Sequence, residues 1–225
     1  MVELAYRAYG PAAAPPLVLL HALGESGADW HDLAGRLATG WRVYAPDLRG
    51  HGSSAWPGEY SIELMRDDVW AFADRLGLDR PVLVGHSLGA MVACLAAQER
   101  PDRVARLVLE EPPPLLPADP PRVVPPRPDG PIAFDWAVVA ALTAQRNAPD
   151  PAWWDRLSVI TAPTLVVAGG PDSHLPQDQL AALAARIPHG RLVTIPAGHL
   201  VHVTQPAAFL SALHGFLAGS GMVDR

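Results

Sequence analysis

The pentapeptide Gly85-His86-Ser87-Leu88-Gly89 constrains the fold more than any other stretch of this chain, because of what stands on either side of it. Residues 81–84 before it form an apolar run typical of a short buried strand, and residues 88–100 place apolar side chains on one helical face. A serine between a strand and a helix lies on a sharp turn that lifts its hydroxyl clear of the sheet. The small residues Gly85 and Gly89 let the backbone pass close to itself. The pattern predicts a nucleophilic Ser87; the alternative is a glycine-rich turn with an idle serine.

Two further residues follow at positions that suit a serine nucleophile. A hydroxyl needs a base within hydrogen-bond reach, and a histidine base needs a carboxylate to fix its tautomer. Asp172 follows the apolar run 162–168, and His199 follows the run 191–195. Open α/β sheets place their sites beyond the carboxyl ends of the strands. The order serine, acid, histidine therefore predicts Ser87, Asp172 and His199 as the catalytic residues.

Two other assignments remain open at this stage. Glu110 and Glu111 end the predicted strand 104–110, a place where some hydrolases carry the acid. His202 stands three residues after His199 and is an alternative base. Asp172 and His199 are preferred because the motifs around them are more typical.

Five segments of the chain together indicate a family. They are His21-Ala22-Leu23-Gly24, Asp47-Leu48-Arg49-Gly50-His51-Gly52-Ser53-Ser54, Gly85-His86-Ser87-Leu88-Gly89, Gly169-Gly170-Pro171-Asp172 and Gly198-His199-Leu200-Val201-His202. With these segments the chain resembles the α/β-hydrolase superfamily over nearly its whole length. The resemblance is specific for the fold and for a serine nucleophile, and much less so for the substrate. Members of this type include esterases, lactonases, thioesterases, perhydrolases and C–C bond hydrolases.

The resemblance also implies where the negative charge of the reaction is stabilised. One oxyanion-hole donor is the backbone N–H of Leu88, directly after the nucleophile. The other is the N–H of Leu23, two residues past His21, in a loop where this chain has Ala22 and the family more often has glycine. His21 is expected to line the substrate pocket. The segment that begins at Asp47 is expected to be a structural turn.

Strand and helix patterns alternate along the chain and predict an α/β fold, with a mostly parallel central sheet and helices on both faces. Strands are expected at residues 4–9, 17–20, 42–45, 81–84, 104–110, 162–168 and 192–195. Helices are expected at residues 29–37, 61–76, 88–100, 133–146, 180–187 and 206–217, with Ser61 as a helix cap and a loose tail after residue 218.

One segment interrupts this alternation. Ten of the twenty residues 112–131 are proline, which excludes a regular helix or a central strand there. We expect residues 1–111 and 158–225 to form the α/β-hydrolase core and residues 112–157 to form a short proline-rich cap insertion. Trp136, Trp153 and Trp154 are expected to wall the substrate pocket; the alternative is that they pack the cap onto the core.

Composition narrows the possible partners. The formal net charge of −6 gives no basic surface for nucleic acid, and the chain has no lysine, which excludes a lysine Schiff base. The single cysteine, Cys94, fits a reducing compartment, and no basic, apolar leader opens the chain, so we expect a cytoplasmic protein. No apolar run of about 18 residues predicts a membrane span. The nine histidines are scattered, so we expect no metal and no cofactor, and a monomer or homodimer.

The sequence therefore predicts a cofactor-free serine hydrolase that acts on a carboxylic ester or a similar acyl bond of a small molecule. A lactonase, a thioesterase or a C–C bond hydrolase on the same fold is the main alternative. A non-catalytic binding protein is a further one, because a fold does not fix a function.

Overall fold

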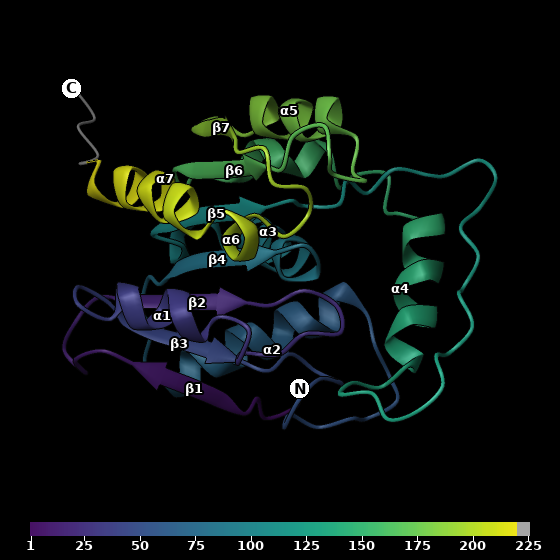
Figure 1. Ribbon diagram of the computed structural model, residues 1–225, viewed down its shortest axis with the longest axis horizontal. Helices are drawn as coiled ribbons and strands as arrows, with labels where there is room; N and C mark the ends of the chain where they lie inside the picture. Colours follow the sequence, from purple (N-terminus) through teal and green to yellow (C-terminus); the bar gives the residue numbers. More distant parts are fainter. Residues whose placement is uncertain (220–225) are drawn as a thin grey trace.

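The structure is a computed structural model that describes residues 1–219 and consists of one seven-stranded sheet flanked by helices (Figure 1). The strands are β1 (Tyr6–Tyr9), β2 (Pro16–Leu20), β3 (Arg42–Pro46), β4 (Val82–His86), β5 (Arg106–Glu110), β6 (Thr164–Ala168) and β7 (Gly190–Thr194). Their order in the sheet is β1-β3-β2-β4-β5-β6-β7. Only the edge pair β1 and β3 is antiparallel; the other neighbours are parallel. The predicted α/β class with a mostly parallel sheet is confirmed.

Burial explains why the inner strands could be predicted from the sequence. The strands β2, β4, β5 and β6 are buried along almost their whole length, and their sequences are nearly continuous apolar runs. A parallel sheet covered by helices on both faces requires such runs. The outer strand β7 is largely exposed and begins two residues before the predicted start.

Helices cover the sheet on both faces. The side chains of α1 (His31–Leu37) and α7 (Pro206–Ala218) share one buried cluster. Those of α2 (Ile62–Arg75), α3 (Leu88–Glu99) and α5 (Gln177–Arg186) share the other. The predicted cap of α2 is confirmed, because the Ser61 hydroxyl accepts a hydrogen bond from the Leu64 N–H at 3.1 Å. Short helices complete the chain: η1 (Pro101–Arg103), η2 (Asp155–Val159) and α6 (Val201–Thr204).

The segment 112–157 leaves the sheet after β5 and returns before β6. It contains no helix or strand over residues 112–131 and then forms α4 (Ala137–Asn147). Figure 1 shows α4 apart from the sheet, beyond the arrowheads of β2 and β4. The helix begins at residue 137 rather than the predicted 133, because Ala133 and Asp135 pair instead with the backbone of Gly52 and Gly50 at 3.0 and 2.8 Å.

The end of α4 is fixed to the rest of the molecule. The Gln145 side chain accepts a hydrogen bond from the Ile62 N–H at 3.0 Å and donates to Glu63, both at the start of α2. Within residues 1–219, no helix combines the length and apolarity that a membrane crossing requires. Most of the predicted loose tail, residues 220–225, lies outside the described residues.

Candidate active site

Ser87 lies on the turn between β4 and α3, with φ +51° and ψ −110°. This backbone conformation is rare for a residue with a side chain and marks a strained turn. A Cβ atom on Gly85 would lie 2.3 Å from the carbonyl oxygen of Gly89, and one on Gly89 would lie 2.1 Å from that of Leu20. Only glycine fits at either position, so the two glycines hold Ser87 at the carboxyl end of β4.

His199 lies between Ser87 and a carboxylate. It lies in the loop after β7, and its own backbone carbonyl oxygen accepts a hydrogen bond from His86 Nε2 at 2.8 Å. Its Nε2 is 3.0 Å from Ser87 Oγ, and its Nδ1 is 3.1 Å from Glu111 Oε2. A neutral ring with its proton on Nδ1 donates to Glu111 and leaves the Nε2 lone pair free to accept the Ser87 proton.

The carboxylate that contacts His199 is therefore Glu111, and the prediction of Asp172 for this contact is wrong. Asp172 is exposed on the turn after β6. That turn does reach the site, but through the backbone N–H of Gly169 and the hydroxyl of Ser173, which both donate to Glu111. Glu111 directly follows β5, and its backbone has φ +47°, a conformation rare for a residue with a side chain.

Glu111 is fully buried, and four donors surround its carboxylate. Oε1 accepts from Gly169 N at 2.6 Å and from Gln177 Nε2 at 3.2 Å; Oε2 accepts from Ser173 Oγ and faces His199. Burial alone raises the pKa of Glu111, but these hydrogen bonds outweigh it and leave the pKa below its ordinary value. Glu111 is thus held as an anion against His199.

A second carboxylate–histidine pair lies beside the first. His202 Nδ1 faces both Glu110 oxygens at 2.9 and 2.8 Å, and its backbone N–H donates to Oε1 at 2.8 Å. Both side chains are buried, and Trp30 stacks on the His202 ring. His202 therefore does not reach Ser87 in the way that His199 does.

The sequence did carry a signal for this arrangement. Glu110 and Glu111 stand together at the end of a strand that is otherwise apolar, and a buried carboxylate requires a partner. His199 and His202 are the partners, because the loop after β7 lies over the carboxyl end of β5. Two acids at the end of a central strand, with two histidines at a loop near the end of the chain, would have indicated the pairing.

The two residues predicted to supply the oxyanion-hole donors, Leu23 and Leu88, border one cavity. Leu23 and Leu88 both line the cavity that Ser87 faces, and neither backbone N–H donates a hydrogen bond within residues 1–219. Leu88 is the first residue of α3, where a helix leaves its N–H groups without internal partners.

His21 does not line the cavity, contrary to the prediction; it is buried beneath the loop that carries Leu23. It is 0% exposed. Its Nε2 accepts a hydrogen bond from the Leu48 N–H at 2.8 Å, so Nδ1 carries the proton and donates to the Ala22 carbonyl at 2.7 Å. Burial, followed by the neighbouring His51, lowers the pKa of His21 to about 4, so the ring is neutral near pH 7.

The turn that begins at Asp47 has the structural role expected of it. The Asp47 carboxylate accepts hydrogen bonds from the backbone N–H groups of Gly27 and Ser53, both at 2.8 Å. His51 in the same turn stacks on Phe134 of the segment 112–157, with the ring planes 9° apart.

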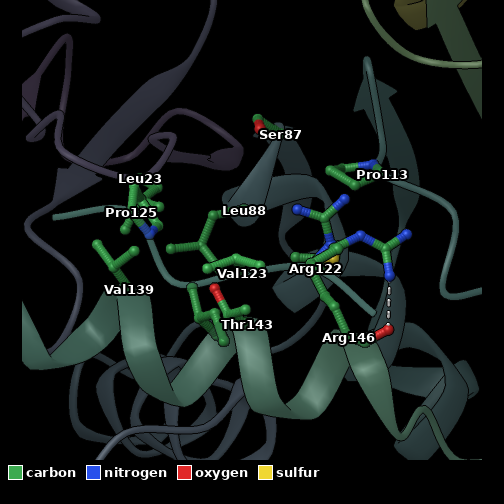
Figure 2. A pocket seen from close by; sticks show the side chains of 12 residues that line it. Leu23, Ser87, Leu88, Pro113, Arg122, Val123, Pro125, Val139, Thr143 and Arg146 are labelled. Atoms are coloured by element: carbon green, nitrogen blue, oxygen red, sulfur yellow. Dashed lines mark hydrogen bonds between the residues drawn. The ribbon is translucent and has the colours of Figure 1, made fainter. Parts of the chain in front are cut away.

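A cavity of about 280 Å³ opens in front of Ser87 (Figure 2). None of the three predicted tryptophans is among its lining residues. Trp153 is buried in the core, the Trp154 indole donates to the Leu115 carbonyl at 3.2 Å, and Trp136 packs on Phe134. Trp153 and Trp154 pack with the core cluster, whereas Trp136 contacts Phe134 of its own segment 112–157. The residues that do line it are Leu23, Ser87, Leu88, Met91, Pro113, Arg122, Val123, Pro125, Val139, Leu142, Thr143 and Arg146.

Two further histidines lie near the His199 ring. The His174 ring is 4.4 Å from it, centroid to centroid, and His86 is 5.0 Å away on the buried side. Burial alone lowers the pKa of His86, but Glu25 and Glu110 outweigh burial and raise it. Among residues 1–219, no three His, Cys, Asp or Glu side chains are grouped closely enough to bind a metal ion.

The family follows from the comparison with known proteins. The profile described as "alpha/beta hydrolase fold" matches residues 15–136, more than half of the chain. The chain belongs to the α/β-hydrolase fold family. This α/β-hydrolase is similar to a hydrolase from Pseudomonas aeruginosa, with 30% sequence identity, a TM-score of 0.84, and coverage of 96% of this chain and 94% of that one.

Curated relatives of this α/β-hydrolase differ in their substrates. It is 34% identical to the putative carbamate hydrolase RutD of Variovorax paradoxus, over 96% of this chain and 97% of that protein. It is 28% identical to the sn-1-specific diacylglycerol lipase ABHD11 of Mus musculus, over 93% of this chain and 83% of that protein. The family and these relatives support a hydrolase. Because their substrates differ, the bond that this chain cleaves has to be inferred from its own site.

Proposed function

We propose that this α/β-hydrolase is a serine hydrolase that cleaves a carboxylic ester through an acyl-enzyme intermediate. The observation that carries the proposal is the position of His199, whose two ring nitrogens lie 3.0 Å from the Ser87 hydroxyl and 3.1 Å from the Glu111 carboxylate. A nucleophile, a base and an orienting carboxylate in one line are the parts that acyl transfer requires.

In the first half of the reaction, Ser87 Oγ attacks the ester carbonyl while His199 Nε2 accepts the hydroxyl proton. The carbonyl oxygen becomes an oxyanion, which the N–H groups of Leu23 and Leu88 stabilise. The tetrahedral intermediate then collapses, the C–O bond to the alcohol breaks, and His199 gives its proton to the departing oxygen. The acyl group remains on Ser87.

In the second half, water attacks the acyl carbon, and His199 accepts one of its protons. Collapse of the second intermediate releases the carboxylic acid and returns the proton to Ser87. Glu111 stays ionised throughout, because it already accepts hydrogen bonds from Gly169, Ser173 and Gln177. It keeps the proton of the neutral ring on Nδ1 and stabilises the imidazolium that forms twice per turnover.

We further propose that residues 112–157 form a cap over the site. Pro113, Arg122, Val123, Pro125 and four residues of α4 face the same cavity as Ser87. This arrangement gives the cap segment one wall of the substrate pocket, while Leu23 after β2 and Ser87, Leu88 and Met91 after β4 supply the other.

The test is hydrolysis of p-nitrophenyl esters from acetate to decanoate, with the Ser87→Ala protein measured in parallel. We expect turnover with an optimum at one chain length, and a loss on the order of 10⁶ in kcat in the variant, as in a known serine protease. A fluorophosphonate probe should label the wild-type protein and not the variant. Turnover that survives Ser87→Ala would show that another group is the nucleophile.

A further inference from the structure

Two arginines, Arg122 and Arg146, line the cavity and have no acidic partner among residues 1–219. Arg122 comes from the proline-rich segment and Arg146 from the last turn of α4, and both line the same space as Ser87. Neither belongs to an ion pair within residues 1–219, whereas Arg49, Arg66 and Arg156 all do. A half-buried guanidinium without a counter-charge is costly, so its presence in a cavity requires an explanation.

Arg122 is held rigidly but only by neutral groups. Its guanidinium donates to the carbonyl oxygens of Arg146 at 2.9 Å and Leu116 at 3.3 Å. Its backbone N–H and C=O pair with the Asn147 side chain, both at 2.9 Å. These bonds neutralise no charge, so the positive charge of Arg122 remains beside the cavity.

Arg146 has fewer contacts still. Its Nε atom is buried and has no hydrogen-bond partner within the described part of the chain. Burial and the adjacent charge of Arg122 lower the pKa of its guanidinium. Figure 2 shows Arg122 and Arg146 together on one side of the cavity, with the side chain of Arg146 rising from α4 toward Ser87.

The rest of the cavity is mostly apolar. Leu88 of the core lines it, together with Val123, Val139 and Leu142 of the segment 112–157. A ligand that fits this lining has a short apolar stretch between a group at Ser87 and an anion at the arginines. A carboxylate suits the site, because the planar guanidinium fork of Arg146 is free to bind two oxygens at once.

We propose that Arg122 and Arg146 bind a free carboxylate of the substrate, so that this enzyme prefers an ester or lactone that carries a second, ionised carboxyl group. This inference rests on the proposed function, because it names the substrate class of the same site. The arginines act on binding and orientation, while Ser87, His199 and Glu111 act on the bond.

The experiment compares matched pairs of esters that differ in the charge at one end. On the acyl side the pair is p-nitrophenyl hemiglutarate and p-nitrophenyl pentanoate; on the alcohol side it is 5-acetoxypentanoate and pentyl acetate. Each kcat/KM is divided by the rate of hydroxide-catalysed hydrolysis of the same ester, which removes differences in intrinsic reactivity. We expect the charged member of at least one pair to be preferred by about tenfold or more, because a hydrogen-bonded charge contributes at least that much.

The variants decide whether the arginines cause this preference. In Arg146→Gln and in Arg122→Gln the charged-to-neutral ratio should fall by about tenfold or more, mainly through a higher KM for the charged ester. Arg146→Lys should retain part of the preference. The control is Arg127→Gln, an exposed arginine in the same proline-rich segment, which should leave the ratio unchanged. Because both esters are measured on one preparation, a partly unfolded variant does not alter the ratio.

A binding measurement separates failure of this inference from failure of the proposed function. Calorimetry with monoethyl glutarate should show binding to the Ser87→Ala protein, and the added Arg146→Gln change should abolish it. No charge preference in either pair, or a preference that survives both glutamine variants, overturns the inference and leaves a Ser87-dependent esterase intact. Turnover that survives Ser87→Ala overturns the proposed function, while the calorimetry still decides the role of the arginines.

Discussion

The exchange of Glu111 for glutamine tests the assignment of the acid directly. All four groups around the carboxylate are donors or can donate: Gly169 N, Gln177 Nε2, Ser173 Oγ and His199 Nδ1. A glutamine side chain must place its NH₂ group against one pair of them. The Gly169 N–H lies at 2.6 Å and belongs to the backbone, so we expect the amide oxygen to stay there and the NH₂ to face Ser173 and His199.

The consequence for the base follows from the tautomer. Facing an NH₂ donor, His199 accepts at Nδ1 and carries its proton on Nε2, where it can no longer accept the Ser87 proton. In a known serine protease the equivalent amide substitution costs about 10⁴ in kcat, or about 5.4 kcal/mol of transition-state stabilisation. We expect a loss of this size in Glu111→Gln. Asp172 is exposed, and its side chain makes no hydrogen bond to His199, so Asp172→Asn should change kcat by less than about threefold.

The assay is p-nitrophenyl ester hydrolysis under saturating substrate, with thermal unfolding measured on each protein. Glu110→Gln is the matched control, because Glu110 is equally buried but pairs with His202. It should lower stability and reduce kcat by far less than Glu111→Gln. A loss of a hundredfold or more in Asp172→Asn, with a mild effect in Glu111→Gln, would refute the reasoning and return the acid to the turn after β6.

Three further predictions concern stability. Gly89→Ala should lower the free energy of unfolding by about 2 kcal/mol or more and reduce activity, because its Cβ would meet a β2 carbonyl at 2.1 Å; Gly35→Ala in α1, where nothing lies within 4 Å, should be neutral or stabilise by about 0.5 kcal/mol. Asp68→Asn should cost about 3 kcal/mol in chemical denaturation, because it leaves the buried Arg49 guanidinium without its counter-charge. The pKa of His21 is about 4 in the folded protein and 6.5 in the unfolded chain. The free energy of unfolding that His21 contributes is therefore complete above pH 6.5 and falls by up to about 3 kcal/mol as the pH drops to 4. A His21→Asn protein should show a flatter dependence of stability on pH in that window.

The elements that the sequence predicted well are those whose burial dictates their pattern. The apolar runs of β2, β4, β5 and β6 are needed on both faces of a covered parallel sheet, and each was located to within about two residues. The turn at Ser87 was equally predictable, since close backbone contacts at Gly85 and Gly89 exclude any side chain. Such features are local, and their physical cause lies within a few residues of the signal.

The acid was harder to predict because its position is set by neighbours in space. Asp172 and Glu111 both follow strands that end at the same edge of the sheet, so strand position alone does not choose between them. The choice depends on which side chain reaches His199, and the structure places Glu111 Oε2 3.1 Å from His199 Nδ1. The pairing of β4 with β5 also places Glu111 beside the turn that carries Ser87, because His86 is in register with Glu110.

Residues 112–157 were the least predictable part of the chain, and the physical reason is their composition. Proline removes backbone donors, so residues 112–131 have no ladder or helix to fix which side chain faces inward. Their positions are set instead by single contacts, such as the pairing of the Arg122 backbone with Asn147. The tryptophans were therefore predicted to line the pocket, whereas the arginines that do line the cavity show no periodic pattern in the sequence.

The catalytic residues and the two arginines lie in parts of the molecule that are held in place differently, so activity and specificity can change separately. Ser87, Glu111 and His199 are fixed by sheet register and by buried hydrogen bonds, so few substitutions around them are tolerated. Arg122 and Arg146 lie on a segment that contacts the core through a handful of side chains, chiefly Gln145 against the start of α2. Substitutions at the two arginines should therefore alter which substrate is bound without disturbing the proposed proton transfer between Ser87 and His199.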